Sequence, residues 1–204
     1  AGPGNNAGDA LFAAAALARR GARVGVIVLC GTTHDAGLAA ALAAGADRID
    51  VSADDSPSTT AGSPSTTVAA STAWAAALTD LDRADLVLDG VLGTGGRRGL
   101  PPHIAHLIRD WRERESGGTV IAVDLPSDLD PDTAEPAHTR IHADATLTFG
   151  GLKSELIDPR TADFTGDIHL VDLGLPLDAD AAVAELLDPD DLSAEFPRPR
   201  PESH

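Results

Sequence analysis

The chain has 204 residues, and its 32 Asp and Glu outnumber its 15 Lys and Arg to give a formal net charge of −17. This charge argues against a nucleic-acid partner because phosphate backbones would be repelled. No apolar run approaches the roughly 20 residues of a membrane span, and the single cysteine, Cys30, excludes both an internal disulfide framework and a four-cysteine zinc site.

Short β-branched runs alternate with Ala- and Leu-rich stretches along the chain. The runs predict strands at 24–29, 49–51, 86–89, 120–124, 145–149 and 168–171, and the stretches predict helices at 8–20, 36–44, 68–79, 102–114 and 180–187. Continuous apolar strands separated by helices are typical of a parallel sheet covered on both faces. The pattern therefore predicts a doubly wound α/β domain whose ligand site lies at the carboxyl ends of the strands.

The ends of the chain differ in composition from its middle. Residues 1–190 carry the α/β pattern, and we expect one domain there, whereas 191–204 end in a Pro-rich stretch that is typical of a linker. The low-complexity segment 54–67 predicts a surface loop. The chain begins without Met, directly on a glycine-rich loop that would normally follow a buried strand. We therefore expect an N-terminally truncated domain that lacks the first strand. No signal segment opens the chain, which favours a cytoplasmic location.

Two glycine-rich loops carry polar side chains that could contact a ligand. The first, 2–9, opens a predicted helix, whose amide groups could face the ligand; an ordinary helix entry capped by Asn6 or Asp9 is the alternative. The second, 89–99, follows a strand that ends in Asp89 and contains two arginines, which suits a phosphate or pyrophosphate. A solvated arginine pair on a surface loop is the alternative there.

Two further loops follow predicted strands in the second half of the chain. Asp124 ends a strand and is followed by Pro126, Ser127 and two more aspartates, which indicates acid/base chemistry or a cation site. A turn stabilised by aspartate side chains is the structural alternative. The last loop ends in Lys153, the only lysine in the chain, which by default would lie on the surface.

The four loops would meet at one edge of the sheet, because they follow parallel strands. Their polar side chains belong to Asn5, Asn6, Asp9, Asp89, Asp124, Ser127 and Lys153. Several ionised carboxylates share a crevice only with a cation, a lysine or raised pKa values. Asn, Asp and Ser oxygens favour a hard ion over zinc or copper, although they do not distinguish potassium from magnesium.

Five segments resemble the NAD(P)H-hydrate epimerases, the YjeF N-terminal domain family. They are GPGNNAGDA (2–10), DLVLDGVLGTGGRRGLP (85–101), VIAVDLPSDLDPDT (120–133), ATLTFGGLKSEL (145–156) and GDIHLVDLGLP (166–176). The resemblance implies a Rossmann-like three-layer fold. It also implies epimerisation of the R and S forms of hydrated NADH and NADPH at C6 of the nicotinamide ring, a repair reaction, with a fused C-terminal dehydratase that uses ADP or ATP and a possible homodimer.

The resemblance also assigns roles residue by residue. It implies potassium ligands at Asn6, Asp89 and Ser127, and Asp124 as a substrate-binding position that we expect to be the acid/base group. The implied substrate-binding positions are Asn5, Asn6, Ala7, Gly8, Asp9, Gly93, Thr94, Gly95, Gly96, Arg97, Arg98, Gly99 and Asp124. We expect Lys153 to join them, because it follows the end of a predicted strand.

Three residues depart from the family pattern. Ala7 and Ala10 replace glycines of the first loop, where a methyl group could obstruct the substrate, and Asp128 replaces a glycine after Ser127. These departures favour, modestly, a non-catalytic nucleotide-binding or scaffolding module on the same fold. An ordinary NAD-dependent oxidoreductase is disfavoured, because the first loop has Ala7 where the dinucleotide fingerprint needs a glycine.

Overall fold

The computed structural model describes residues 1–57, 71–93, 99–114, 118–129, 141–177 and 182. In chain order its elements are α1 (Asn5–Arg19), β1 (Gly25–Val28), α2 (Asp35–Ala43), β2 (Asp47–Asp50), η1 (Ala53–Asp55), α3 (Thr72–Arg83), β3 (Leu86–Asp89), α4 (Pro102–Arg112), β4 (Thr119–Val123), β5 (Ala145–Phe149), α5 (Ser154–Ile157), α6 (Ala162–Thr165) and β6 (Asp167–Val171). The six predicted strands are confirmed, with ends shifted by at most two residues. The helix predicted at 180–187 lies outside the described residues, apart from residue 182.

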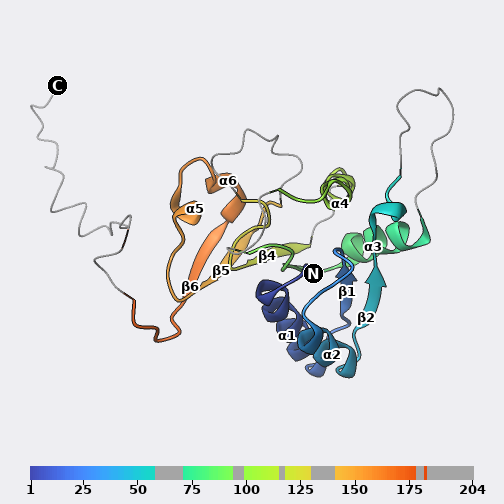
Figure 1. The fold of residues 1–204 in the computed structure, drawn as a ribbon, viewed down its shortest axis with the longest axis horizontal. Coiled ribbons are helices and arrows are strands. Elements are labelled where there is room, and N and C mark those ends of the chain that lie inside the picture. Colours follow the sequence, from blue (N-terminus) through green and yellow to red (C-terminus); the bar gives the residue numbers. More distant parts are fainter. Residues whose placement is uncertain (58–70, 94–98, 115–117, 130–140, 178–181, 183–204) are drawn as a thin grey trace, which may run out of the picture.

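All strand pairs are parallel, as the apolar runs predicted. β1 pairs with β2, and β3, β4, β5 and β6 form a four-stranded sheet in that order. Between β1 and β3 lie the first two residues of the chain: the Ala1 carbonyl accepts from the Leu29 amide, and the Gly2 amide donates to the Gly90 carbonyl. Figure 1 places the N-terminus between these two groups of strands. The expected loss of the first strand stays a prediction.

Two apolar clusters lie on opposite faces of the sheet. One joins α1 and α2 to β1 through residues such as Leu11, Val28 and Ala41. The other joins α3 and α4 to the sheet through Trp74 and Ile104, which are fully buried or nearly so. Because helices cover both faces (Figure 1), the predicted α/β fold with a parallel sheet is confirmed, and it forms a Rossmann-like three-layer arrangement.

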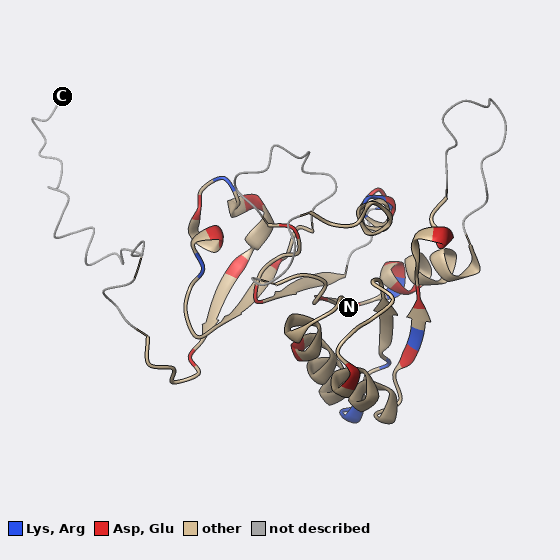
Figure 2. Cartoon of the chain, in the orientation of Figure 1, with Lys and Arg blue, Asp and Glu red and all other residues tan. Residues whose placement is uncertain are grey.

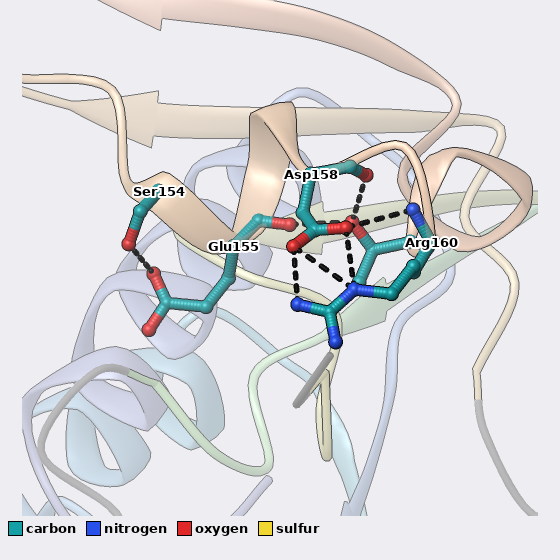
Figure 3. Close-up of polar contacts among 5 residues, drawn as sticks. Ser154, Glu155, Asp158 and Arg160 are labelled. Atoms are coloured by element: carbon teal, nitrogen blue, oxygen red, sulfur yellow. Dashed lines mark hydrogen bonds and ion pairs between the residues drawn. The ribbon is translucent and has the colours of Figure 1, made fainter. Parts of the chain in front are cut away.

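The connection from β5 to β6 contains Lys153, the short helices α5 and α6, and a turn between these two helices. Asp158 pairs with Arg160 at 2.7 Å (Figure 3), and the Arg160 hydrogen bond lowers the pKa of the Asp158 carboxyl. The buried Thr161 hydroxyl donates to the carbonyls of Glu155 and Asp158 at 2.6 and 2.8 Å. The Thr161 bonds tie the end of α5 to the start of α6.

Charge and hydropathy add two observations. Acidic residues are spread over helices, strands and loops of the described chain rather than gathered on one element (Figure 2). In the ranges that the structure describes, no helix is long and apolar enough to cross a membrane.

Candidate active site

The site begins with Asp89, the last residue of β3, which is 2% exposed. Its Oδ1 accepts hydrogen bonds from the Ser127 hydroxyl at 2.6 Å and the Val91 amide at 3.2 Å, and its Oδ2 accepts from the Ser127 amide at 2.7 Å. Burial raises the pKa of the Asp89 carboxyl, and the bonds from Ser127 and Val91 partly offset that rise. Among the described residues no Lys, Arg or His side chain forms an ion pair with this carboxylate.

Asn6 and Ser127 both reach the backbone of Leu92. Asn6 Nδ2 donates to the Leu92 carbonyl at 2.9 Å, and the Leu92 amide donates to the Ser127 hydroxyl at 2.8 Å. The structure thus brings together three oxygen-bearing side chains from α1, β3 and the loop after β4. The spacing of these residues along the chain is 83 and 38 positions, so only the fold makes them neighbours.

One atom in this cluster is buried without a partner: Asn6 Oδ1 accepts no hydrogen bond within the described residues. Buried polar atoms normally have a partner, and an exception needs an explanation. A hard cation prefers oxygen ligands. Three oxygens here still have a lone pair for one: Asn6 Oδ1, Asp89 Oδ2 and Ser127 Oγ. The oxygen cluster therefore fits a bound cation.

The interpretation of the first loop as an ordinary side-chain-capped helix entry is wrong. α1 begins at Asn5, three residues before the predicted start, and its N-cap Gly4 has φ 108° with no side-chain cap. Asn6 is consequently free to bond Leu92 rather than the helix. Asn5 and Asp9 are exposed, whereas Gly8 is buried against the His34 ring.

The two alanines that replace family glycines point into the protein. Ala7 is 0% exposed and Ala10 is 6% exposed, so neither methyl group stands in an open crevice. Ala10 packs on Gly90, where an added Cβ would lie 2.4 Å from the Ala10 Cβ. The argument that these methyl groups would block a ligand, and with it the support for a non-catalytic module, is thereby removed.

A second polar group lies on the loop that carries Ser127. Asp124 follows β4 directly, and its Oδ1 accepts from Lys153 Nζ at 2.5 Å. Lys153 Nζ also donates to the Thr148 hydroxyl at 2.8 Å and to the Phe149 carbonyl at 2.9 Å. Lys153 is thus half-buried in a network instead of lying free on the surface. The Asp124–Lys153 pair supplies one of the charge-balancing arrangements that the acidic loops required.

Asp124 and Asp128 both have φ 68°, in the left-handed region that costs most residues about 1–2 kcal/mol. Asp128 is the third residue of a turn in which the Leu129 amide donates to the Pro126 carbonyl at 3.1 Å. This position favours glycine when φ is positive, and Asp tolerates it better than most residues. The replacement of a family glycine by Asp128 is therefore compatible with the turn.

The remaining predicted positions divide into two groups. Gly93 lies close to Asn6, with an added Cβ only 2.9 Å from Asn6 Cβ, and Gly99 is exposed with φ 83°. Thr94, Gly95, Gly96, Arg97 and Arg98 lie outside the described residues. The substrate-binding assignments stay predictions.

Sequence reasoning missed Thr148 and the backbone of Leu92. The alternation of Thr146 and Thr148 in β5 was the available signal for the first, because two hydroxyl groups on one buried strand face each need a partner. Nothing in the sequence marks Leu92, whose contribution comes from its main-chain N–H and C=O groups.

Residues 1–154 match the family described as YjeF-related protein N-terminus. The chain is 40% identical to an NAD(P)H-hydrate epimerase of Microbacterium testaceum and 38% identical to one of Clavibacter michiganensis; 86% of the chain matches in each case. It spans 60% and 71% of the length of these two relatives.

Two further matches concern domain organisation and fold. The chain is 34% identical to the bifunctional NAD(P)H-hydrate repair enzyme Nnr of Mycobacterium tuberculosis, with 98% of this chain matched and 35% of that protein. A crystal structure of yeast ynu0 is similar with a TM-score of 0.50 and 17% identity, over 73% of this chain and 55% of the yeast chain. The second likeness supports the fold alone.

We expect Gly90→Ala to destabilise the domain by about 1–3 kcal/mol, because the new Cβ would overlap Ala10 and press on the Asn6 carbonyl. The double variant Gly90→Ala/Ala10→Gly should recover part of this loss, since the nearest overlapping atom is removed. Urea unfolding of both single variants and the double variant measures the coupling. Strict additivity of the two single effects would contradict the packing of α1 on Gly90.

At Asp128 we expect the alanine variant to be less stable than the glycine variant by about 1–2 kcal/mol, because alanine is strained at φ 68° and glycine is not. Asp163 in α6 is the matched control, where the helical backbone should make glycine the less stable of the two. Thermal unfolding of the four variants gives the comparison. If alanine and glycine had the same order of stability at both positions, the left-handed conformation of Asp128 would not account for the difference.

Proposed function

The chain belongs to the YjeF N-terminal family, and we propose that it epimerises the R and S forms of hydrated NADH and NADPH at C6 of the nicotinamide ring. The observation that carries the proposal is the pair of polar groups on the loop after β4, where Asp124 stands three residues from Ser127. A carboxylate available for proton transfer thereby lies on the same short loop as an oxygen cluster that fits a cation. The epimerase names of the relatives support the assignment.

The proposed chemistry requires one proton carrier beside C6. Inversion at that carbon needs a bond to break and re-form on the other face of the ring. When the C6 hydroxyl group leaves as water, it takes up one proton, and the N1 lone pair forms a C6=N1 double bond. When water adds to the other face of C6, this double bond returns to a lone pair on N1 and the water releases one proton. A single carboxyl group that donates and recovers this proton balances the cycle, and Asp124 is placed for that role.

The start of α1 supports binding of the nucleotide part of the substrate. Its first turn has no side-chain cap, so the amide groups there are available to a polar or anionic ligand. The glycine-rich loop 2–9 and the segment 93–99 of the second glycine-rich loop are the proposed contacts to that ligand.

We also propose that the oxygen cluster binds potassium through Asn6, Asp89 and Ser127. The unpartnered Asn6 Oδ1 and the buried Asp89 support a cation of low charge. Burial raises the pKa of Asp89, the amino group of Ala1 offsets only part of that rise, and no side chain of the described residues forms an ion pair with Asp89. When bound, potassium would offset the charge of Asp89 and hold the three segments that carry its ligands at fixed distances. In the described residues there is no group of three or more His, Cys, Asp or Glu side chains that could form a zinc-type site.

The longer relatives support the proposal that this domain is joined to a second enzymatic domain. Because the bifunctional Nnr proteins match this chain over about a third of their length, we propose that the domain acts with an ADP- or ATP-dependent dehydratase fused on its C-terminal side. Residues 191–204, the proposed linker, lie outside the described residues. We further propose a cytoplasmic location, where nicotinamide nucleotides are used, and a homodimer.

Asp124→Asn should lower the rate of R/S interconversion by about 10²–10⁴-fold, because the amide cannot carry the proton. Asn tolerates positive φ, so the backbone at 124 should be retained. Each separated epimer is incubated with protein, and the approach to equilibrium is followed by chromatography above the uncatalysed rate. Asp47→Asn, on the exposed β2 strand, is the matched control. A folded Asp124→Asn protein with the parent rate would exclude Asp124 as the proton carrier.

Potassium should stabilise the parent protein against unfolding, by about 2.7 kcal/mol when its concentration is 100 times the dissociation constant. Asp89→Asn and Ser127→Ala should lose this response, because each removes an oxygen ligand or its charge. Thermal unfolding in KCl is compared with choline chloride at equal ionic strength, with NaCl and MgCl₂ as tests of selectivity. Equal stabilisation by potassium and choline would rule out the cation site.

A further inference from the structure

The ammonium group of Lys153 is fully engaged inside the protein. It donates to Asp124 Oδ1 at 2.5 Å, to the Thr148 hydroxyl at 2.8 Å and to the Phe149 carbonyl at 2.9 Å. A lysine ammonium has three N–H donors, so these three acceptors use all of them. The side chains of Lys153 and Asp124 are 20% and 17% exposed, which shields the pair from most of the solvent. No donor remains on Lys153 for a ligand in this arrangement.

The contact holds one carboxylate oxygen of Asp124 and leaves the other. Oδ1 accepts from Lys153 and, at 3.4 Å, from the Thr148 hydroxyl. Within the part of the chain that the structure describes, no hydrogen bond reaches Oδ2. The carboxylate is therefore held asymmetrically, with a single oxygen available to a substrate.

The backbone of Asp124 is also constrained. Its φ of 68° is a conformation that a non-glycine residue keeps only when its surroundings enforce it. The Asp124 amide donates to the Leu147 carbonyl at 2.7 Å, and the Leu125 amide donates to the Val123 carbonyl at 2.9 Å. Strained backbone and a clamped side chain at one residue are typical of a group whose direction matters for chemistry.

We propose that Lys153, supported by Thr148, is a positioning residue that directs Oδ2 of Asp124 toward C6 of the substrate. This inference rests on the proposed epimerase function and refines it. Lys153 acts through Asp124 and does not touch the substrate, in contrast to the direct contact that its place in the sequence predicted. Thr148 holds the ammonium from the interior of the protein, since it is a fully buried residue of β5.

The two roles of Lys153 predict different kinetics. A positioning role predicts that Lys153→Met lowers kcat by about 10–100-fold and changes KM by less than about threefold, because misdirected proton transfer affects the chemical step. Lys153→Arg should recover part of the lost kcat. A substrate-binding role predicts the reverse, a raised KM with kcat retained, and that result would overturn the proposal.

Thr148→Val provides a second, nearly isosteric variant that leaves the lysine in place. It removes an acceptor of Lys153, and we expect kcat to fall about 3–10-fold without a matching rise in KM. The matched control is Arg160→Met, which removes a cation that pairs with Asp158 in the adjoining turn (Figure 3) and should leave kcat within about twofold. Parent kcat in folded Lys153→Met or in Thr148→Val would refute the positioning role.

A spectroscopic measurement tests the contact without any turnover. Because Lys153 is the only lysine in the 204 residues, protein labelled with ¹⁵N-lysine has a single side-chain ammonium resonance. We expect the ammonium protons to exchange slowly with water in the parent protein, and their resonance to broaden in folded Asp124→Asn because exchange becomes faster. A signal that is unaffected by Asp124→Asn would refute the contact.

The two measurements separate the failure of this inference from the failure of the proposed function. A parent protein that does not epimerise the substrate would remove the function, and the positioning role with it, whatever the ammonium signal shows. An active parent whose Lys153 and Thr148 variants keep its kcat would leave the function intact and remove the positioning role alone.

Discussion

The hydrogen bonds between Asp89 and Ser127 are the interaction on which the rest of the site depends. They join the end of β3 to the loop after β4 through both the hydroxyl and the amide of Ser127. Asp89 is buried, so its carboxylate would be costly without these donors. The bonds thereby set the course of the loop that begins at Asp124. The Ser127 hydroxyl also accepts from the Leu92 amide, and the Leu92 carbonyl accepts from Asn6.

Close approach of backbone segments makes this arrangement possible. Gly90 lets α1 lie against the end of β3, because any side chain there would overlap Ala10. An added Cβ at Gly93 would also lie too near a side chain, at 2.9 Å from Asn6 Cβ. The oxygen cluster thus depends on the absence of side chains at two positions of the second loop. Packing alone requires glycine at these two positions. A glycine-rich loop after a strand is therefore not by itself evidence of phosphate binding.

The site separates into a cation-type cluster and a proton-transfer pair that share one loop. In the first, charge is offset by hydrogen bonds and, in the proposed function, by potassium; in the second, the carboxylate of Asp124 is offset by Lys153. The difference follows from burial, because Asp89 is enclosed whereas Asp124 keeps partial access to solvent. Two aspartates at the ends of neighbouring strands can consequently serve different purposes.

The sequence by itself determined the parallel α/β class, the positions of the six strands and the family, because apolar runs, helical stretches and the strand-end motifs are local patterns that need no knowledge of contacts. It also placed Asp89, Asp124 and Ser127 at strand ends, where a doubly wound sheet gathers its ligands. Only the tertiary structure decided that Asn6 leaves the helix end for Leu92, that Ala7 and Ala10 are buried, and that Lys153 meets Asp124 and Thr148. These outcomes depend on side-chain direction and burial across segments far apart in the chain, and no local pattern encodes them.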